Sequence, residues 1–225
     1  MIEAFYALKG KYADKKKLAD DAIYLERVLC AESGGIQDQI AASFGGLNRI
    51  NFSRDGYTVN PVIISPERKN ALNDKLMLFF TGLSRFSSDI QKDTEKSMKD
   101  KTKELIEMHH LVDEAEKILT DKSRSFDDFG RLLDHTWKLK RGISSGISTG
   151  SIDEQYERAM KAGALGGKLL GAGGGGFLLF YVPEDRQENV KSVLSGQLHV
   201  PFRFENEGTK IVVYEAEYFE QEKKS

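Results

Sequence analysis

Apolar and polar residues recur with a helical period over the first part of the chain. Apolar side chains return every three or four positions in residues 1–10, 14–33 and 36–44, which predicts three helices. Glycine follows the first and third stretches, as Gly10 and as the pair Gly45–Gly46, and glycine commonly ends a helix. We therefore expect the chain to open with short helices.

The period then becomes an extended one. Residues 47–64 alternate apolar and polar side chains around Arg54-Asp55-Gly56, which predicts a β-hairpin with a glycine turn. Ser65 and Pro66 favour the start of a short helix. The apolar run at 75–82 predicts a compact buried strand.

The rest of the chain mixes helices with strands. Residues 88–121 place apolar side chains at helical spacing among Lys and Glu, which predicts a long helix with a solvated face. Ser151 and Glu154 have capping-box spacing and should open a helix. The other predicted elements are helices at 125–142, 152–164 and 184–197, a glycine- and serine-rich loop at 142–150, and strands at 177–182, 201–206 and 210–218, with a turn at 207–208. Strands separated by helices predict an α+β fold, in which a helical layer covers one face of an antiparallel sheet.

Composition narrows the class of protein. The chain has 225 residues, of which 40% are hydrophobic and 30% charged, enough for one large domain or two small ones with real cores. The net charge of -2 favours neither nucleic acid nor an anionic membrane as a partner. No apolar run approaches the ~18 residues that span a bilayer, and the first residues lack a secretory signal pattern. With Cys30 as the single cysteine, we expect a reducing, cytoplasmic location.

Histidine and cysteine positions do not predict a metal site. His109 and His110 are adjacent on a predicted helix, so their side chains point to different faces. His135, His199 and Cys30 have no partners at the spacing of metal ligands.

Five glycines occupy six consecutive positions at 171–176. Each glycine inside a helix or strand costs about 0.5 to 1 kcal/mol relative to alanine, so this run predicts a loop. Gly171, Gly173 and Gly176 match G-x-G-x-x-G, but we expect the loop to follow a helix and open a strand, the reverse of a dinucleotide-binding turn. A Walker loop fails because Lys168 precedes the run. Two interpretations stay open: a loop that approaches an anion or a neighbouring loop, and a tight corner between helix and strand.

Asp38 lies in a second unusual stretch. It follows two glycines and falls in the first turn of the predicted helix at 36–44, between Gln37 and Gln39. The glycines would let a ligand approach the backbone closely. The alternative is a stabilising carboxylate at a helix N-terminus, worth about 0.3 to 1 kcal/mol.

Together these stretches resemble one known family. GGKLLGAGGGG at 166–176 strongly resembles the C-terminal glycine motif of the GHMP kinases, which include galactokinase, homoserine kinase and mevalonate kinase. GGIQDQIAASFGGLNRI at 34–50 is similar to the segment that carries the catalytic aspartate of the sugar kinases in that family. With LFFTGLSR at 78–85 and HTWKLKRGIS at 135–144, the pattern is most similar to the D-glycero-D-manno-heptose 7-phosphate kinase branch, over essentially the whole chain.

The resemblance implies phosphoryl transfer from ATP, with Mg²⁺, to the anomeric hydroxyl of a heptose 7-phosphate, giving the 1,7-bisphosphate. Such chemistry asks the protein mainly to position the hydroxyl and neutralise charge. Asp38 matches the aspartate that orients or deprotonates the hydroxyl. The glycine loop matches the motif that packs against the phosphate-binding loop near the active site, and the resemblance implies as its cofactor-binding residues Gly171, Ala172, Gly173, Gly174, Gly175 and Gly176. The residues implied in binding the sugar phosphate are Gly34, Gly35, Gln37, Arg49, Arg85, Lys138 and Arg141, with Arg85 ranked first for the phosphate itself.

The chain departs from the family in one respect. It lacks the loop of form Pro-x-x-x-Gly-Leu-Gly-Ser-Ser that holds the ATP phosphates, and residues 1–10 resemble the later part of the helix which that loop opens. We interpret 1–62 as a remnant of the GHMP kinase N-terminal domain and 63–225 as the C-terminal, ferredoxin-like α/β sandwich. Two alternatives to a heptose kinase stay open: a kinase for a galactose- or fucose-type sugar, and a truncated, non-catalytic sugar-binding or interaction fragment. Homo-oligomers are also compatible with the sequence.

Overall fold

A computed structural model describes residues 1–83, 97–98, 100–171 and 173–215. Contacts divide the chain into two compact units. Unit 1 comprises residues 1–31, 36–46 and 205–225, and unit 2 comprises residues 32–35 and 47–204. The hairpin region thus groups with unit 2, and the C-terminal segment groups with unit 1. The assignment of 1–62 and 63–225 to two family domains is a statement about descent and stays a prediction.

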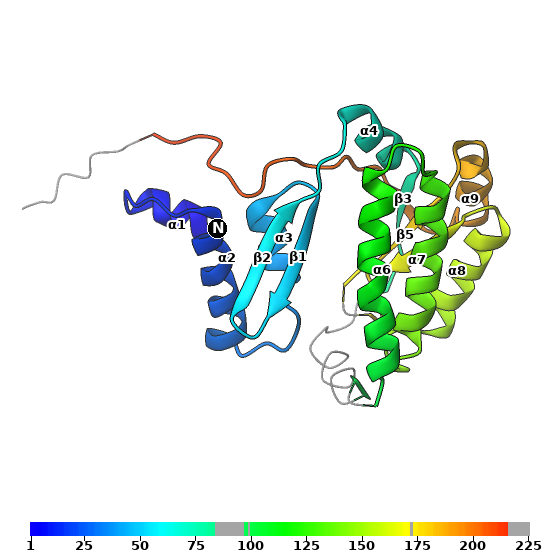
Figure 1. The fold of residues 1–225 in the computed structure, drawn as a ribbon, viewed down its shortest axis with the longest axis horizontal. Helices are drawn as coiled ribbons and strands as arrows, with labels where there is room; N and C mark the ends of the chain where they lie inside the picture. Colours follow the sequence, from blue (N-terminus) through cyan, green and yellow to red (C-terminus); the bar gives the residue numbers. More distant parts are fainter. Residues whose placement is uncertain (84–96, 99, 172, 216–225) are drawn as a thin grey trace, which may run out of the picture. The chain divides into compact units, whose positions relative to one another are not determined.

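Unit 1 contains the predicted N-terminal helices. They are α1 (Ile2–Leu8), α2 (Lys15–Tyr24) with a π-helical continuation at Leu25–Leu29, and α3 (Gln37–Phe44) (Figure 1). Asp14 caps α2 by accepting a hydrogen bond from the amide of Lys17 at 2.7 Å. The hydroxyl of Tyr6 on α1 donates to the carboxylate of Asp21 on α2 at 2.6 Å, which joins these two helices.

The C-terminal segment of unit 1 lies against the end of α3. The Gly46 amide donates to the Glu205 carbonyl at 3.0 Å, and the Thr209 amide donates to the Ala42 carbonyl at 2.8 Å. Gly45 has φ +65°, and a Cβ there would lie 2.1 Å from the amide nitrogen of Gly208. The predicted strands at 201–206 and 210–218 are wrong over their described residues, which form no strand. Isolated bonds to a helix end replace the continuous ladder that a strand requires.

The hairpin in unit 2 has the predicted form. β1 (Asn48–Ser53) and β2 (Gly56–Pro61) pair antiparallel, with Ser53 opposite Gly56 across the short turn. Helix α4 (Pro66–Asp74) then starts after Ser65, whose hydroxyl accepts a hydrogen bond from the amide of Arg68 at 3.3 Å. Both predictions from residues 47–74 are therefore confirmed.

The main sheet of unit 2 has four strands in the order β4-β5-β3-β6, and every neighbouring pair is antiparallel. The strands are β3 (Leu76–Phe80), β4 (Gly166–Leu169), β5 (Phe177–Tyr181) and β6 (Leu198–Val200). The sequence predicted β3 and β5 but missed β4 and β6.

The helices of unit 2 agree largely with the predictions. They are α6 (Thr102–Thr120), α7 (Phe126–Arg141), α8 (Gly150–Lys161) and α9 (Gln187–Val193), the last preceded by a 3-10 turn at Glu184–Arg186. The rest of the long helix predicted at 88–121 falls mostly outside the described residues. The predicted capping box at Ser151 is wrong, because Thr149 caps α8 and its side chain accepts from the amide of Ile152.

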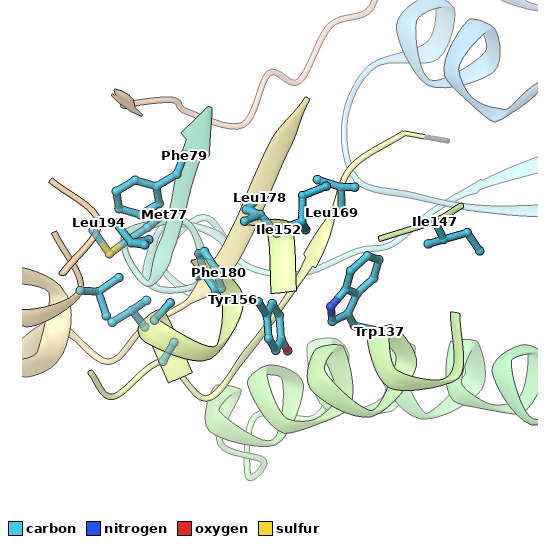
Figure 2. Close-up of a cluster of buried hydrophobic side chains, with 14 of the residues drawn as sticks. Met77, Phe79, Trp137, Ile147, Ile152, Tyr156, Leu169, Leu178, Phe180 and Leu194 are labelled. Carbon is cyan, nitrogen blue, oxygen red and sulfur yellow. The ribbon is translucent and has the colours of Figure 1, made fainter. Parts of the chain in front are cut away.

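The largest core of unit 2 lies between the sheet and its helices. Met77 and Phe79 of β3 and Leu178 and Phe180 of β5 are each 2% exposed or less. Figure 2 shows this sheet face beside helical side chains. Those helical side chains include Trp137 of α7 and Ile152 and Tyr156 of α8. Apolar burial of this extent is the main stabilising contribution to a domain of this size. The predicted α+β class is confirmed.

Candidate active site

The glycine loop, residues 170–176, connects two antiparallel strands. It runs from β4 to β5, and the Leu170 amide donates to the Phe177 carbonyl at 2.8 Å. The expectation that the loop follows a helix is wrong, because Gly166–Leu169 is a strand. A dinucleotide-binding turn stays excluded, since that turn must open a helix and this loop opens a strand.

Backbone conformation explains much of the glycine content. Gly171, Gly173, Gly174 and Gly176 have φ values of +78°, +123°, +71° and +101°. Residues with a Cβ rarely adopt such values, because the Cβ then crowds the neighbouring carbonyl. Glycine at these positions follows from the shape of the loop.

One side of the glycine loop contacts the chain just after β3. The Gly176 amide donates to the Leu83 carbonyl at 3.0 Å, and the Thr81 amide donates to the Gly176 carbonyl at 2.9 Å. A Cβ on Gly175 would lie 2.6 Å from the Leu83 carbonyl oxygen. The loop and residues 81–83 are therefore close enough to require glycine at 175.

The other side of the glycine loop contacts the loop between α7 and α8. The Gly174 amide donates to the Ile147 carbonyl at 3.0 Å, and a Cβ on Gly173 would lie 2.8 Å from the Ile147 Cα. Ile147 is fully buried, so this contact is anchored in the core. The Lys140 ammonium donates to the Gly171 carbonyl at 2.9 Å.

Parts of three of the stretches that carry the family resemblance thus lie together: 81–83, Lys140 near the end of α7, and the glycine loop. Gly173 and Gly175 fit the interpretation of a loop that approaches neighbouring segments, because their missing Cβ atoms make room for the backbone of Ile147 and Leu83. Gly171 differs, because a Cβ there would meet no atom within 4 Å. Close packing therefore does not explain the glycine at 171. Ala172 lies outside the described residues.

Asp38 lies on the exposed face of α3, in unit 1. Its neighbour Gln37 is exposed as well, whereas Ile40 and Ser43 are buried on the other face. Ile36 is the N-cap and makes no side-chain capping bond, so Asp38 is in the first turn but is not the cap itself. Within the described part of the chain, no hydrogen bond or ion pair engages its carboxylate. A free carboxylate at a helix start is available to accept a proton or a hydroxyl hydrogen bond.

The role expected for Gly34 and Gly35, to let a ligand approach the backbone closely, stays a prediction. Gly34 has φ +146°, at the edge of the region that favours glycine. By contacts, Gly34 and Gly35 group with unit 2.

Each described cation that the resemblance assigns to the sugar phosphate already contacts a carboxylate. The Arg49 guanidinium lies 2.7 Å from Asp113 and 2.6 Å from Glu116, and hydrogen bonds to Glu116 and then Asp113 raise the pKa of Arg49. The other two pairs are Lys138–Asp134 at 2.6 Å and Arg141–Asp153 at 2.7 Å. Binding a phosphate would require these cations to share or exchange their partners. Arg85 lies outside the described residues.

Sequence reasoning missed two buried polar residues beside the glycine loop, Thr81 and Gln155. Thr81 is 5% exposed and its hydroxyl donates to the Gly176 carbonyl at 3.0 Å. Gln155 is 6% exposed and its amide donates to the Thr81 carbonyl at 3.3 Å. Thr81 belongs to a stretch that resembles the family, so attention to that stretch could have found it. A glutamine in the middle of an amphipathic helix carries no such signal.

The described residues hold no group of three or more His, Cys, Asp or Glu side chains arranged to bind a metal ion. Among these same residues, every helix is too short or too polar to cross a bilayer.

Part of this α+β sandwich is similar to a known family: residues 112–199 match the family described as GHMP kinases C terminal. That range includes α7, α8 and the glycine loop.

Relatives extend the likeness to most of the chain. This chain is 32% identical over 214 residues to D-glycero-alpha-D-manno-heptose 7-phosphate kinase from Campylobacter jejuni, and the alignment covers 93% of this chain and 63% of the relative. A solved D-glycero-D-manno-heptose 1-phosphate kinase from Bacteriodes thetaiotaomicron is similar at 25% identity and TM-score 0.60, covering 94% of this chain and 60% of that one. A solved mevalonate kinase with 21% identity shares the fold at TM-score 0.70, covering 92% of this chain and 62% of that one. The chain therefore spans less than two thirds of the length of these relatives.

Proposed function

We propose that this protein is an ATP-dependent sugar kinase that phosphorylates the anomeric hydroxyl of D-glycero-D-manno-heptose 7-phosphate, giving the 1,7-bisphosphate. The observation that carries the proposal is the 32% identity to the Campylobacter jejuni heptose 7-phosphate kinase along 93% of the chain. Asp38 and the glycine loop lie inside the stretches that resemble the kinase motifs.

Asp38 is the proposed catalytic residue. In the reaction, the sugar hydroxyl oxygen forms a bond to the γ-phosphorus of ATP, the bond from that phosphorus to the bridging oxygen of ADP breaks, and the hydroxyl proton is released. Asp38 would orient the hydroxyl and accept this proton. Its exposure and its lack of a partner among the described residues suit this role.

The glycine loop is the proposed support for the nucleotide phosphates. ATP would supply the phosphoryl group. A phosphate would approach the loop at Gly171, where an added Cβ would meet no atom within 4 Å, because glycine lets an anion come close to the backbone. The described residues offer no cluster of side chains that matches a Mg²⁺ site.

Arg85 is the first proposed contact to the phosphate of the substrate, with Arg49, Lys138 and Arg141 as further candidates. A planar guanidinium forms two parallel hydrogen bonds to a phosphate, which suits Arg85 to this task. The ion pairs of the other three cations place them second.

A second candidate is a kinase for a fucose-type sugar. The chain is 30% identical over 191 residues to L-fucokinase/L-fucose-1-P guanylyltransferase from Bacteroides fragilis. The heptose proposal requires a phosphate on the acceptor, and the fucose proposal does not.

The deciding experiment measures ADP release by the 225-residue chain with Mg-ATP and heptose 7-phosphate, with fucose and galactose as competing acceptors and with Asp38→Asn as the matched variant. Turnover that needs both Asp38 and the phosphorylated heptose supports the proposal. Faster turnover on fucose supports the second candidate. A folded protein that binds heptose 7-phosphate without releasing ADP contradicts both kinase proposals for this chain and supports a sugar-binding role.

A further inference from the structure

Thr81 connects the end of β3 to the glycine loop through both its backbone and its side chain. Its amide and its hydroxyl both donate to the Gly176 carbonyl, at 2.9 and 3.0 Å. The same hydroxyl oxygen accepts from the Leu83 amide at 3.3 Å. The hydroxyl therefore uses both its donor and its acceptor to join residues 81–83 to the loop.

Gln155 reaches the same place from helix α8. Its side-chain amide donates to the Thr81 carbonyl at 3.3 Å. Its Oε1 is buried and has no hydrogen-bond partner among the described residues. An unpaired buried amide oxygen is unfavourable, and a leucine of similar volume would avoid it. The bond to Thr81 is thus the contact that glutamine provides and leucine cannot.

The glycine loop depends on such contacts for a defined shape. Glycine has the widest conformational freedom of any residue, so a loop with five glycines needs outside contacts to hold one conformation. On one side this contact is the bond from Gly174 to the buried Ile147. On the other side it is the pair of bonds from Thr81, which Gln155 holds in place.

We propose that Thr81 and Gln155 are positioning residues that hold the Gly174–Gly176 end of the glycine loop in one conformation, and thereby set the affinity of the loop for the phosphates of ATP. The inference rests on the proposed kinase function for its ligand, but the hold on the loop itself concerns the free protein. Neither side chain is assigned a contact with substrate.

The first test is hydrogen–deuterium exchange at the amides of Gly174 and Gly176. Thr81→Val keeps the side-chain shape and removes the hydroxyl, and Gln155→Leu removes the amide. We expect both variants to speed exchange at these amides by roughly three- to tenfold, the loss of about one hydrogen bond. Thr81→Ser should restore slow exchange because it keeps the hydroxyl.

Thr136→Val is the matched control. Its hydroxyl also donates to a backbone carbonyl, that of Leu132 at 2.8 Å, but within α7 and away from the loop. This variant should leave exchange at Gly174 and Gly176 unchanged. Equal acceleration by Thr136→Val, or unchanged exchange in Thr81→Val, would overturn the proposed hold on the loop. Exchange in α6 reports whether each variant remains folded.

The second test separates the inference from the proposed function. Thr81→Val and Gln155→Leu should raise the KM for ATP, or the Kd for ADP, by roughly three- to tenfold, with a smaller effect on kcat and on the KM for the sugar. A merely structural role would lower the amount of active protein without moving KM. If the wild-type chain binds ADP but shows no turnover, the kinase function is contradicted. The Kd values of the variants and the wild-type chain for ADP then test the inference by themselves. A wild-type chain that does not bind ADP overturns the affinity part of the inference.

Discussion

The glycine loop in unit 2 and the Asp38 segment in unit 1 use their residues in opposite ways. The loop is held on both sides by backbone contacts, and its glycines are required by positive φ values and by close approach to Leu83 and Ile147. Asp38 is exposed and its carboxylate is unengaged within the described residues. One region is therefore defined by conformation, and the other presents a reactive group. Substitutions should affect stability in the first region and turnover in the second.

The largest expected effect is on turnover, at Asp38. Asp38→Asn keeps the shape and exposure of the side chain but removes the proton acceptor, so kcat should fall by roughly 10² to 10⁴. The melting temperature should fall by no more than about 4 °C, because a carboxylate in the first turn of a helix contributes only about 0.3 to 1 kcal/mol. Steady-state kinetics beside a thermal melt checks both parts. Wild-type turnover in the variant would remove Asp38 from the mechanism.

Gly175→Ala should show the opposite pattern, a loss of stability. The new Cβ would lie 2.6 Å from the Leu83 carbonyl oxygen, so either the loop or residues 81–83 must move. Overpacking of this kind costs about 1 to 3 kcal/mol of unfolding free energy, measurable by urea denaturation. Gly150→Ala, where a Cβ meets nothing within 4 Å, is the control and should cost little. Similar losses in both variants would contradict the close-packing explanation.

Arg85→Ala tests the proposed contact between Arg85 and the phosphate of the substrate. Arg85 follows residues 81–83, and it is the first proposed phosphate contact. The KM for heptose 7-phosphate should rise roughly tenfold, the loss of a charge-assisted contact, while the KM for an unphosphorylated analogue changes less. Equal changes for both acceptors would exclude Arg85 as the phosphate contact.

The smallest expected effects are on the pH dependence of stability, and they differ between the units. In unit 1, hydrogen bonds from Lys17 and then Tyr6 hold the pKa of Asp21 below its ordinary 3.8. In unit 2, burial, followed by the charge of Lys191, lowers the pKa of His199 below its ordinary 6.5. In both cases the unfolded chain binds the proton more readily, so stability falls as pH decreases below the ordinary pKa. Unit 2 should therefore begin to weaken below about pH 6.5 and unit 1 only below about pH 4.

Urea denaturation from pH 8 to pH 3, with exchange measured at amides of each unit, checks this order. Asp21→Asn should remove the loss of stability of unit 1 at acid pH. His199→Asn should remove the loss of stability of unit 2 just below neutral pH. Loss of stability in unit 1 before unit 2 on acidification would contradict the assignment.

Local pattern was sufficient where an element is defined by its own residues. The hairpin at 48–61 follows from alternation and a glycine turn, and α4 follows from Ser65 and Pro66. The prediction failed at β4, where Gly166 has no strand propensity. A Cβ on Gly166 would lie 1.9 Å from the Gly130 carbonyl oxygen of α7. Glycine is therefore required here by a close contact with a helix that is distant in the sequence. The strands predicted near the C-terminus failed for the same reason, since a strand needs a partner that sequence alone does not reveal.

The features of the candidate site also fall into two groups, those that the sequence predicts and those that only the tertiary structure shows. By itself the sequence determined the α+β class, the glycine loop, Asp38 and the family resemblance, because these depend on periodicity and on residue types at short spacing. Only the tertiary structure decided that the loop joins two strands, that residues 81–83 and Ile147 hold it, and that Thr81 and Gln155 meet beside it. The physical reason is that packing and hydrogen bonds join residues far apart in the chain, such as Thr81 and Gly176, which are 95 positions apart, and no local pattern records which distant groups will meet.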